Sequence, residues 1–331
     1  MNNKVEIVKL TSAEISALWT ASVNISVVFC MVTHFIETCK DPEILTLLEE
    51  SKHLAETHKN QIEQLFIQEK IVIPEGFKVE KHVVPNAVKL FSDLYYIQCI
   101  LQMSKFGLAS HAAGLTVSAR EDVRKLFNTL MDDVAQLYHN AVSKMQEKGI
   151  YVRMPYMNYP TEIDFVNKEI FLTGWLGRRR PLLGIECTHL LINAIQNEMG
   201  MQMCTAFSQV SQDRELREYF LRGKNLCKHI LGSIHDVLQE SEVPAANSWD
   251  YGVTDSTVAP FSEQLMLYVI GVLSNLGMAA YGAGLGTTMR RDISAMYANF
   301  ITKTGTFGED GMNLMIERKW LEQPPQFEAA K

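Results

Sequence analysis

Ala113-Gly114-Leu115 and Arg120-Glu121-Asp122-Val123 recur 170 residues further along the chain, as Ala283-Gly284-Leu285 and Arg290-Arg291-Asp292-Ile293. The apolar triplet and the charged tetrapeptide keep the same distance from each other in both places. Self-similarity at a fixed spacing is the signature of an internal repeat, in which each copy is one structural unit. We therefore interpret the chain as two copies of one unit.

The same register extends in both directions from this stretch. Phe91-Ser92-Asp93 matches Phe261-Ser262-Glu263, and Met145, Glu147 and Pro155 match Met315, Glu317 and Pro325. Further upstream the spacing is 172 residues, which pairs Glu14, Asp41, Glu43, Lys52, Leu54 and Ile62 with Glu186, Asp213, Glu215, Lys224, Leu226 and Ile234. The chain is a tandem duplication.

Helix start signals divide each copy into four helices. Thr11-Ser12-Ala13-Glu14 and Ser118-Ala119-Arg120-Glu121 have the capping-box pattern, and Asp41-Pro42-Glu43 places a cap, a proline and an acid where a helix begins. Two short turns around one long crossover are typical of ferritin-like bundles. We predict an all-α protein made of two tandem ferritin-like up-down four-helix bundles, each with one long crossover between its second and third helices.

The predicted domains are a first bundle at residues 1–155, a connector at 156–181 and a second bundle at 182–331. The long crossover of the second copy is expected from Asn247 to Pro260. The connector carries the basic run Arg178-Arg179-Arg180. Because the chain is acidic overall, we interpret this run as part of a solvated linker and not as an anion site.

Composition restricts the class of protein. The 331 residues are 47% hydrophobic and 21% charged, as in ordinary soluble proteins. The formal net charge of −7 argues against a general nucleic-acid surface or a surface for anionic membranes. The 16 methionines indicate adaptable apolar packing, and a homodimer or a protein partner would suit such a surface.

Two charge-poor segments imitate membrane spans, at residues 15–36 and 264–289. The segment of the first copy that corresponds to the latter contains Asp93, Lys105 and His111, so we expect buried bundle helices and no membrane partner. The six cysteines form no C-x-x-C pair and are expected to be reduced thiols. The N-terminus lacks the pattern of a signal peptide, and the predicted location is cytoplasmic.

Metal binding is the first chemistry to consider in such a bundle. The Glu-x-x-His pairs Glu50/His53 and Glu186/His189 lie in different copies, so they cannot complete one di-iron site. A mononuclear Fe, Mn or Zn site in the first bundle is the remaining hypothesis, and its candidate ligands are His34, Glu37, Glu50, His53 and His58. The acids shared by both copies stand near helix starts, where carboxylates cap the free N–H groups, and we expect several of them to face solvent.

Several stretches together resemble one family, the domain of unknown function 3231 family, which is found mainly in spore-forming bacteria. They are Leu10–Ser16, Ser118–Val123, Glu218–Lys224, Val253–Thr257, Met289–Ile293 and Glu322–Pro325. The resemblance covers nearly the whole chain, implies a ferritin-like helical fold and implies no established activity. It also implies a histidine on the second helix of both copies. His58 fits this in the first copy, whereas Ile230 has that place in the second and His229 comes one residue earlier.

The sequence therefore predicts a cytoplasmic tandem helical-bundle protein without catalytic activity, which has a structural or interaction role that the resemblance connects with sporulation. Two alternatives stay open. One is a metal-binding protein or oxidoreductase that uses the His/Glu group of the first bundle. The other is a carrier of an apolar ligand held between the helices.

Overall fold

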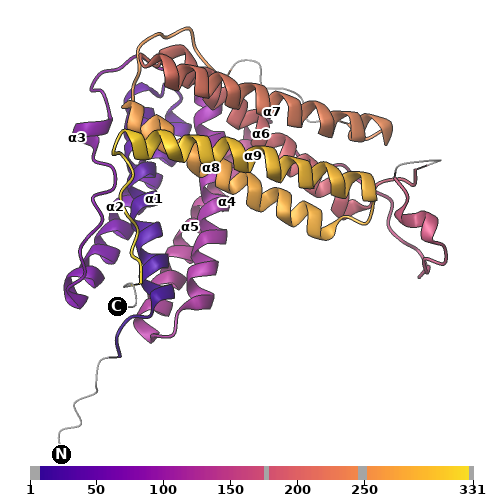
Figure 1. Cartoon of the computed structure of the whole chain (residues 1–331), viewed down its shortest axis with the longest axis horizontal. Helices are drawn as coiled ribbons and strands as arrows, with labels where there is room; N and C mark the ends of the chain where they lie inside the picture. Colours follow the sequence, from indigo (N-terminus) through magenta and orange to yellow (C-terminus); the bar gives the residue numbers. More distant parts are fainter. Residues whose placement is uncertain (1–7, 175–178, 245–251, 328–331) are drawn as a thin grey trace, which may run out of the picture. The chain divides into compact units, whose positions relative to one another are not determined.

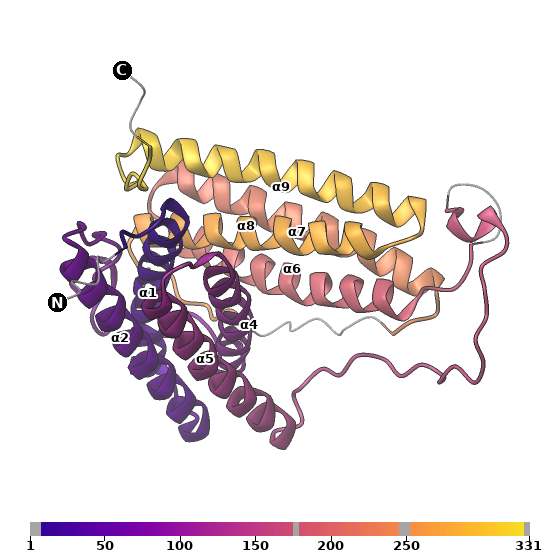
Figure 2. The same cartoon turned by 90° about the horizontal axis from the view of Figure 1, so that it is seen from below.

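The computed structural model describes residues 8–174, 179–244 and 252–327. Every regular element in these ranges is a helix, which confirms the all-α prediction (Figures 1 and 2). The helices are α1 (Ser12–Thr38), α2 (Pro42–Glu69), α3 (Val79–His82), α4 (Asp93–Val117), α5 (Glu121–Glu147), η1 (Glu169–Leu172), α6 (Gly184–Val210), α7 (Arg214–Glu240), α8 (Glu263–Thr287) and α9 (Arg291–Glu317). Four long helices fall in each copy of the repeat.

The chain forms two compact units whose bounds differ from the predicted domains. The first unit contains Met1–Tyr151 together with Val258–Leu265 and Lys319–Lys331, and the second contains Val152–Thr257 and Met266–Arg318. Two short pieces of the second copy thus pack in the first unit. Sequence periodicity could not show this, because it reports which face of a helix is buried and not which unit buries it.

The second and fourth helices of each copy run antiparallel and are joined by a ladder of polar pairs. In the first unit, α2 and α5 are joined by His58–Asp133, Glu50–Asn140 and Asp41–Lys148. In the second unit, α7 and α9 are joined by His229–Lys303, Arg222–Asp310 and Asp213–Arg318. Residue numbers that rise on one helix fall on its partner, as an up-down bundle requires.

The apolar stripes of these helices meet in two cores. The core of the first unit is built on α1, α2 and α5 by Leu18, Ile25, Ile62, Phe66, Phe127 and Leu130. The corresponding core of the second unit contains Leu190, Ile230, Ile234, Tyr281, Tyr297 and Phe300. Burying one such side chain contributes roughly 1.5–3 kcal/mol, so burial of these stripes is the main force that holds the helices together.

Two of the predicted helix caps are confirmed, whereas the capping box predicted at Ser118 is wrong although α5 does begin there. Thr11 and Glu14 form a reciprocal capping box, and the Asp41 carboxylate accepts the Glu43 and Ile44 amides. The pattern at Ser118 does not form a capping box, because the Ser118 hydroxyl donates to the Gly114 carbonyl at 2.7 Å instead. The N-cap of α5 is Arg120, whose side chain makes no capping hydrogen bond. The free amides at this helix start are satisfied by a residue from another helix.

The crossover of the first copy, between α2 and α4, turns at Gly76. Its φ is +54°, and an added Cβ would lie 2.7 Å from the Ser26 hydroxyl oxygen. That hydroxyl accepts the Phe77 amide at 2.9 Å, which holds the crossover against α1. The second crossover was expected at 247–260, and its first part lies outside the described residues.

Among the described residues, two helices are long and apolar enough to span a membrane by length and composition, α1 and α8. Within the tested windows 56% of the α1 residues and 39% of the α8 residues are buried inside the protein. Core helices of soluble proteins meet the same criterion, so the prediction that the chain has no membrane partner remains a prediction.

Candidate functional site

A buried carboxylate joins the starts of two helices in the first unit. Glu14 is fully buried, and its Oε2 accepts the Thr11 amide at 2.7 Å, so it closes the start of α1. Its Oε1 accepts the amides of Ala119 and Arg120 at 2.9 and 2.7 Å, so it also caps the start of α5. One side chain therefore satisfies backbone donors of two helices that are far apart in the sequence.

The second unit repeats this arrangement. Glu186 is 1% exposed, and its Oε2 accepts the Leu183 amide at 2.9 Å at the start of α6. Its Oε1 accepts the amides of Met289 and Arg290 at 3.0 and 3.2 Å, at the start of α9. The prediction that the shared acids cap helices holds for these two. Several of the shared acids do face solvent, as expected, among them Glu43, Asp122 and Glu215. Glu14 and Glu186 do not, because each of these carboxylates caps across the bundle.

The surroundings of both carboxylates lower their pKa and so favour the charged form at neutral pH. Burial alone would raise the pKa of Glu14, but hydrogen bonds from Arg120, Thr11 and Ala119 outweigh it and lower the pKa. At Glu186 burial also acts to raise the pKa, but the Arg180 guanidinium and the backbone amides outweigh it and lower the pKa to about 2. A charge held in this way stabilises the positive ends of two helix dipoles at once.

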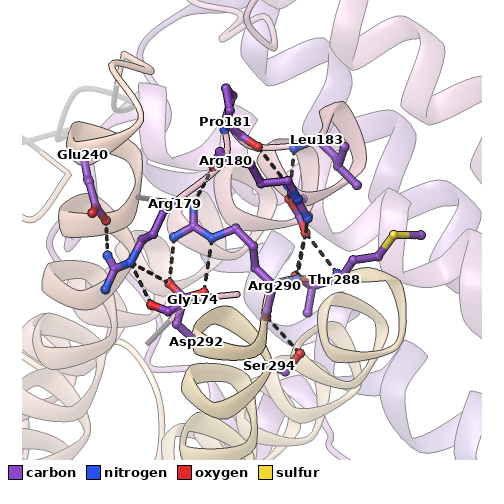
Figure 3. A network of polar contacts seen from close by, with 12 residues as sticks. Gly174, Arg179, Arg180, Pro181, Leu183, Glu240, Thr288, Arg290, Asp292 and Ser294 are labelled. Atoms are coloured by element: carbon purple, nitrogen blue, oxygen red, sulfur yellow. Dashed lines mark hydrogen bonds and ion pairs between the residues drawn. The ribbon is translucent and has the colours of Figure 1, made fainter. Parts of the chain in front are cut away.

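The basic run of the connector is part of this second site, which corrects its interpretation as a solvated linker (Figure 3). Arg180 binds both oxygens of Glu186 at 2.8 Å and donates from Nε to the Phe171 carbonyl. Arg179 pairs with Glu240 and donates to the Gly174 carbonyl. Arg178 lies outside the described residues. A run of three arginines indicates charge, but only the fold shows that a buried acid stands next to it.

The five predicted metal ligands do not come together. His34 is fully buried on α1, whereas Glu37, one turn further, is exposed. On α2, His53 is exposed and Glu50 binds the Asn140 amide. No group of three His, Cys, Asp or Glu side chains that could hold a metal ion occurs among the residues that the structure describes. The predicted grouping does not form among these residues, because His34 lies inside the core whereas Glu37 and His53 are exposed.

His58 has different neighbours from those that the metal hypothesis assigned to it. Its Nε2 lies 3.0 Å from the Asp133 carboxylate on α5, and its ring stands edge-on to His111 of α4 at 6.2 Å between centroids. Burial lowers the pKa of His58 despite Asp133, and burial together with the nearby His58 lowers that of His111 to about 4. At neutral pH this is a pair of uncharged imidazoles inside the first bundle.

Sequence reasoning missed His111 and Asp133, although the repeat held a signal for them. In the second copy Ile230, Tyr281 and Lys303 stand where His58, His111 and Asp133 stand in the first. All three members change together, which is the behaviour expected of residues in contact. In the second unit the residue at the place of His111 has a different partner, because the Tyr281 hydroxyl donates a hydrogen bond to the Asn197 side chain at 2.9 Å.

The cysteines offer no nucleophile. All six are free thiols, as predicted, and three of them are buried. Burial raises the pKa of Cys30 and Cys227 to about 12 and that of Cys39 to about 11. Since the thiolate is the reactive form, these side chains are inert at neutral pH.

Several of the most exposed large apolar side chains among the described residues lie on the connector between the two copies. Residues 152–168 have neither helical nor strand structure. The exposed side chains are Met154 (37%), Tyr156 (89%), Met157 (66%), Tyr159 (90%), Ile163 (87%), Phe165 (81%), Val166 (63%) and Ile170 (64%). We call residues 154–170 the apolar connector. Soluble proteins rarely leave so many large apolar groups in one continuous stretch without a binding role.

Comparison with known proteins agrees with the repeat. The family described as "Protein of unknown function (DUF3231)" matches residues 2–163 and again residues 170–331. The chain belongs to this family. No curated protein matches it. Among solved structures, it is similar to a protein from Bacillus halodurans C-125 that is provisionally described as a spore coat protein. The identity is 18% and the TM-score 0.41, over 46% of this chain and 98% of that one.

Proposed function

We propose that this DUF3231 protein is a non-catalytic interaction protein that binds a protein partner through the apolar connector. The observation that carries the proposal is the exposure of 81–90% at Tyr156, Tyr159, Ile163 and Phe165. Aromatic and methionine side chains are enriched in the cores of protein interfaces, and tyrosine and tryptophan dominate their hot spots. The resemblance to a family of spore-forming bacteria supports a setting in sporulation.

The chemistry of the partner follows from the chemistry of the connector. An extended segment with apolar side chains of different shapes fits an apolar groove, in which its backbone also finds hydrogen-bond partners. Glu162 and Asp164 lie in the middle of the segment, so basic residues at the rim of the groove would complement them. The partner is therefore a protein with an apolar groove and a basic rim.

The test uses the full chain with a photo-cross-linking amino acid in place of Tyr159, produced in the native cell. The partner that is trapped is then purified and titrated against the wild-type chain and against the triple variant Tyr156→Ser, Tyr159→Ser, Phe165→Ser. We expect the triple variant to bind at least about tenfold more weakly, with an unchanged melting temperature, because the three side chains are exposed.

A cross-linker in place of Phe327, which is 83% exposed outside the connector, is the matched control and should not trap the same partner. Equal binding of the wild-type chain and the triple variant would overturn the proposal. So would the absence of any cross-link, or a cross-link only between two copies of this chain, which would assign the connector to self-association.

A further inference from the structure

The first unit is completed by residues that belong to the second repeat. Residues 258–265, which we call the crossover arm, lie in the repeat at 170–331 but pack in the first unit. Residues 319–327, the C-terminal arm, do the same. The contacts of both arms with residues of the first repeat are specific.

The crossover arm pairs with the first repeat as a short antiparallel bridge between Val83 and Phe261. The Val84 amide donates to the Pro260 carbonyl and the Ser262 amide donates to the His82 carbonyl, each at 2.9 Å. The His82 Nδ1 and the Ser262 hydroxyl form a further hydrogen bond at 2.8 Å. Backbone and side chain thus determine one register for the arm.

Phe261 anchors this arm by burial. Its side chain is 2% exposed, and the ring of His34 stands edge-on to it, with 5.3 Å between the ring centroids. His34 is itself fully buried, and both of its ring nitrogens lack a hydrogen-bond partner among the described residues. The His34 ring is therefore held in the core by its edge-on contact with Phe261 and not by hydrogen bonds.

The C-terminal arm adds an electrostatic contact at the crossover turn. The Glu322 carboxylate accepts the Glu75 amide at 2.9 Å and the Gly76 amide at 3.2 Å. The arm is held to the crossover arm in turn, because the Gln264 side chain donates to the Trp320 carbonyl at 3.0 Å. Both arms thus close on the same segment of the first repeat, residues 75–84.

We propose that residues 75–84 and His34 form a docking site for the second repeat, so that the two repeats stay bound to each other without a covalent connector. The occupant is the Pro260-Phe261-Ser262 segment together with Glu322. A buried phenylalanine flanked by backbone and side-chain hydrogen bonds is the pattern of an interface hot spot. The kind of partner that this site accepts is a repeat of the same family.

The test cuts the chain where it is exposed. A protease recognition sequence replaces the residues between Tyr159 and Ile163 in the full chain, and the cut protein is analysed by size-exclusion chromatography and native mass spectrometry. We expect the two halves to remain one complex at micromolar concentration. Separation of the halves under native conditions would overturn the proposal.

Variants of the cut protein show whether the arm carries this binding. Phe261→Ala should raise the dissociation constant of the halves about 100-fold or more, because a buried phenylalanine is lost from the site. Ile316→Ala, a control on α9 that is 55% exposed and lies in neither arm, should leave it unchanged. Equal dissociation constants for the two variants would refute the role of the arm.

If Phe261→Ala does not fold, two other measurements test whether the arms hold the two halves together. The double variant Ser262→Ala, Glu322→Gln removes only hydrogen bonds and should weaken the complex about tenfold. Hydrogen exchange at the Val84 and Ser262 amides should stay slow after the cut in the wild-type sequence. Rapid exchange at both amides would show that the arm has left its site and would overturn the proposal.

Discussion

Replacement of Glu186 by glutamine tests the interpretation of the buried carboxylates most directly. The carboxylate accepts hydrogen bonds at both oxygens, from backbone amides of two helices and from the Arg180 guanidinium. A glutamine has the same shape, but one of its two ends is an NH₂ group, which donates. That NH₂ group would face other hydrogen-bond donors. Arg180 would also lose its counter-charge in a largely buried site, in which the Arg180 side chain is 12% exposed and the Glu186 side chain is 0% exposed.

Two independent estimates of the magnitude agree. Removing one partner of a buried ion pair typically costs 3–5 kcal/mol. The fall of the Glu186 pKa from 4.5 to about 2 corresponds to about 3 kcal/mol, at 1.36 kcal/mol per pH unit. We therefore expect Glu186→Gln to lower the free energy of unfolding of the second unit by about 3 kcal/mol. That is a large part of the 5–15 kcal/mol that typically stabilises a domain.

The assay is chemical denaturation followed by circular dichroism, at pH 7 and at several values down to pH 3. The Glu186 carboxylate contributes its full stability above pH 4.5, its unfolded pKa, and loses it progressively as the pH falls toward 2, its folded pKa. The difference between wild type and Glu186→Gln should therefore shrink with acidification. The control Glu240→Gln breaks the half-exposed pair with Arg179 and should cost less than about 1 kcal/mol. A loss below about 1 kcal/mol for Glu186→Gln at pH 7, or a difference independent of pH, would refute the reasoning.

Three further predictions concern the first unit and the metal hypothesis. Glu14→Gln should destabilise the first unit by about 1–3 kcal/mol, less than Glu186→Gln, because Arg120 reaches the Glu14 carboxylate only through its backbone amide and sends its guanidinium to Glu69 and Asp122; an equal loss in the two denaturation curves would contradict this. The neutral His34 has a pKa of about 4, lowered by burial, so the unfolded chain takes up its proton first as the pH falls below 6.5, and stability is lost between pH 6.5 and 4. The free energy of unfolding should therefore fall by about 3 kcal/mol less in His34→Phe than in the wild type when the pH is lowered from 7.5 to 4.5. An equal fall in the two proteins would count against the burial of a neutral imidazole. Tag-free protein should contain less than about 0.1 equivalent of Fe, Mn or Zn by elemental analysis, because the five candidate ligands do not meet, and one equivalent would restore the metal hypothesis.

The architecture was largely predictable, since it depends on local signals. Capping residues such as Thr11 and Asp41 act within one turn of the helix they start, and an amphipathic stripe reports its own buried face. The duplication was visible because both copies retain Glu14/Glu186 and Asp41/Asp213 at corresponding helix starts. Ser118 shows the limit of local reasoning: its capping pattern is present in the sequence, but Glu14 of another helix takes the role.

The candidate site was less predictable, because its residues meet only through tertiary packing. His34, Glu37, Glu50, His53 and His58 have a plausible spacing for a metal site, yet the packing of α1 and α2 buries His34 and leaves Glu37 and His53 exposed. Arg180 reads as a solvated charge in the sequence and binds a buried acid in the structure. His58 meets Asp133 and His111 from two other helices, and no spacing along α2 predicts that.

By itself, the sequence determined the two repeats, the helical class and the positions of most helix starts, because all of these follow from periodicity and from contacts within a turn. The tertiary structure decided which charges are buried, which histidines meet and which unit receives the Phe261 arm. The physical reason is the range of the interactions. A cap acts over three residues, whereas the Glu14 carboxylate acts over about a hundred residues of chain that only the folded core brings together.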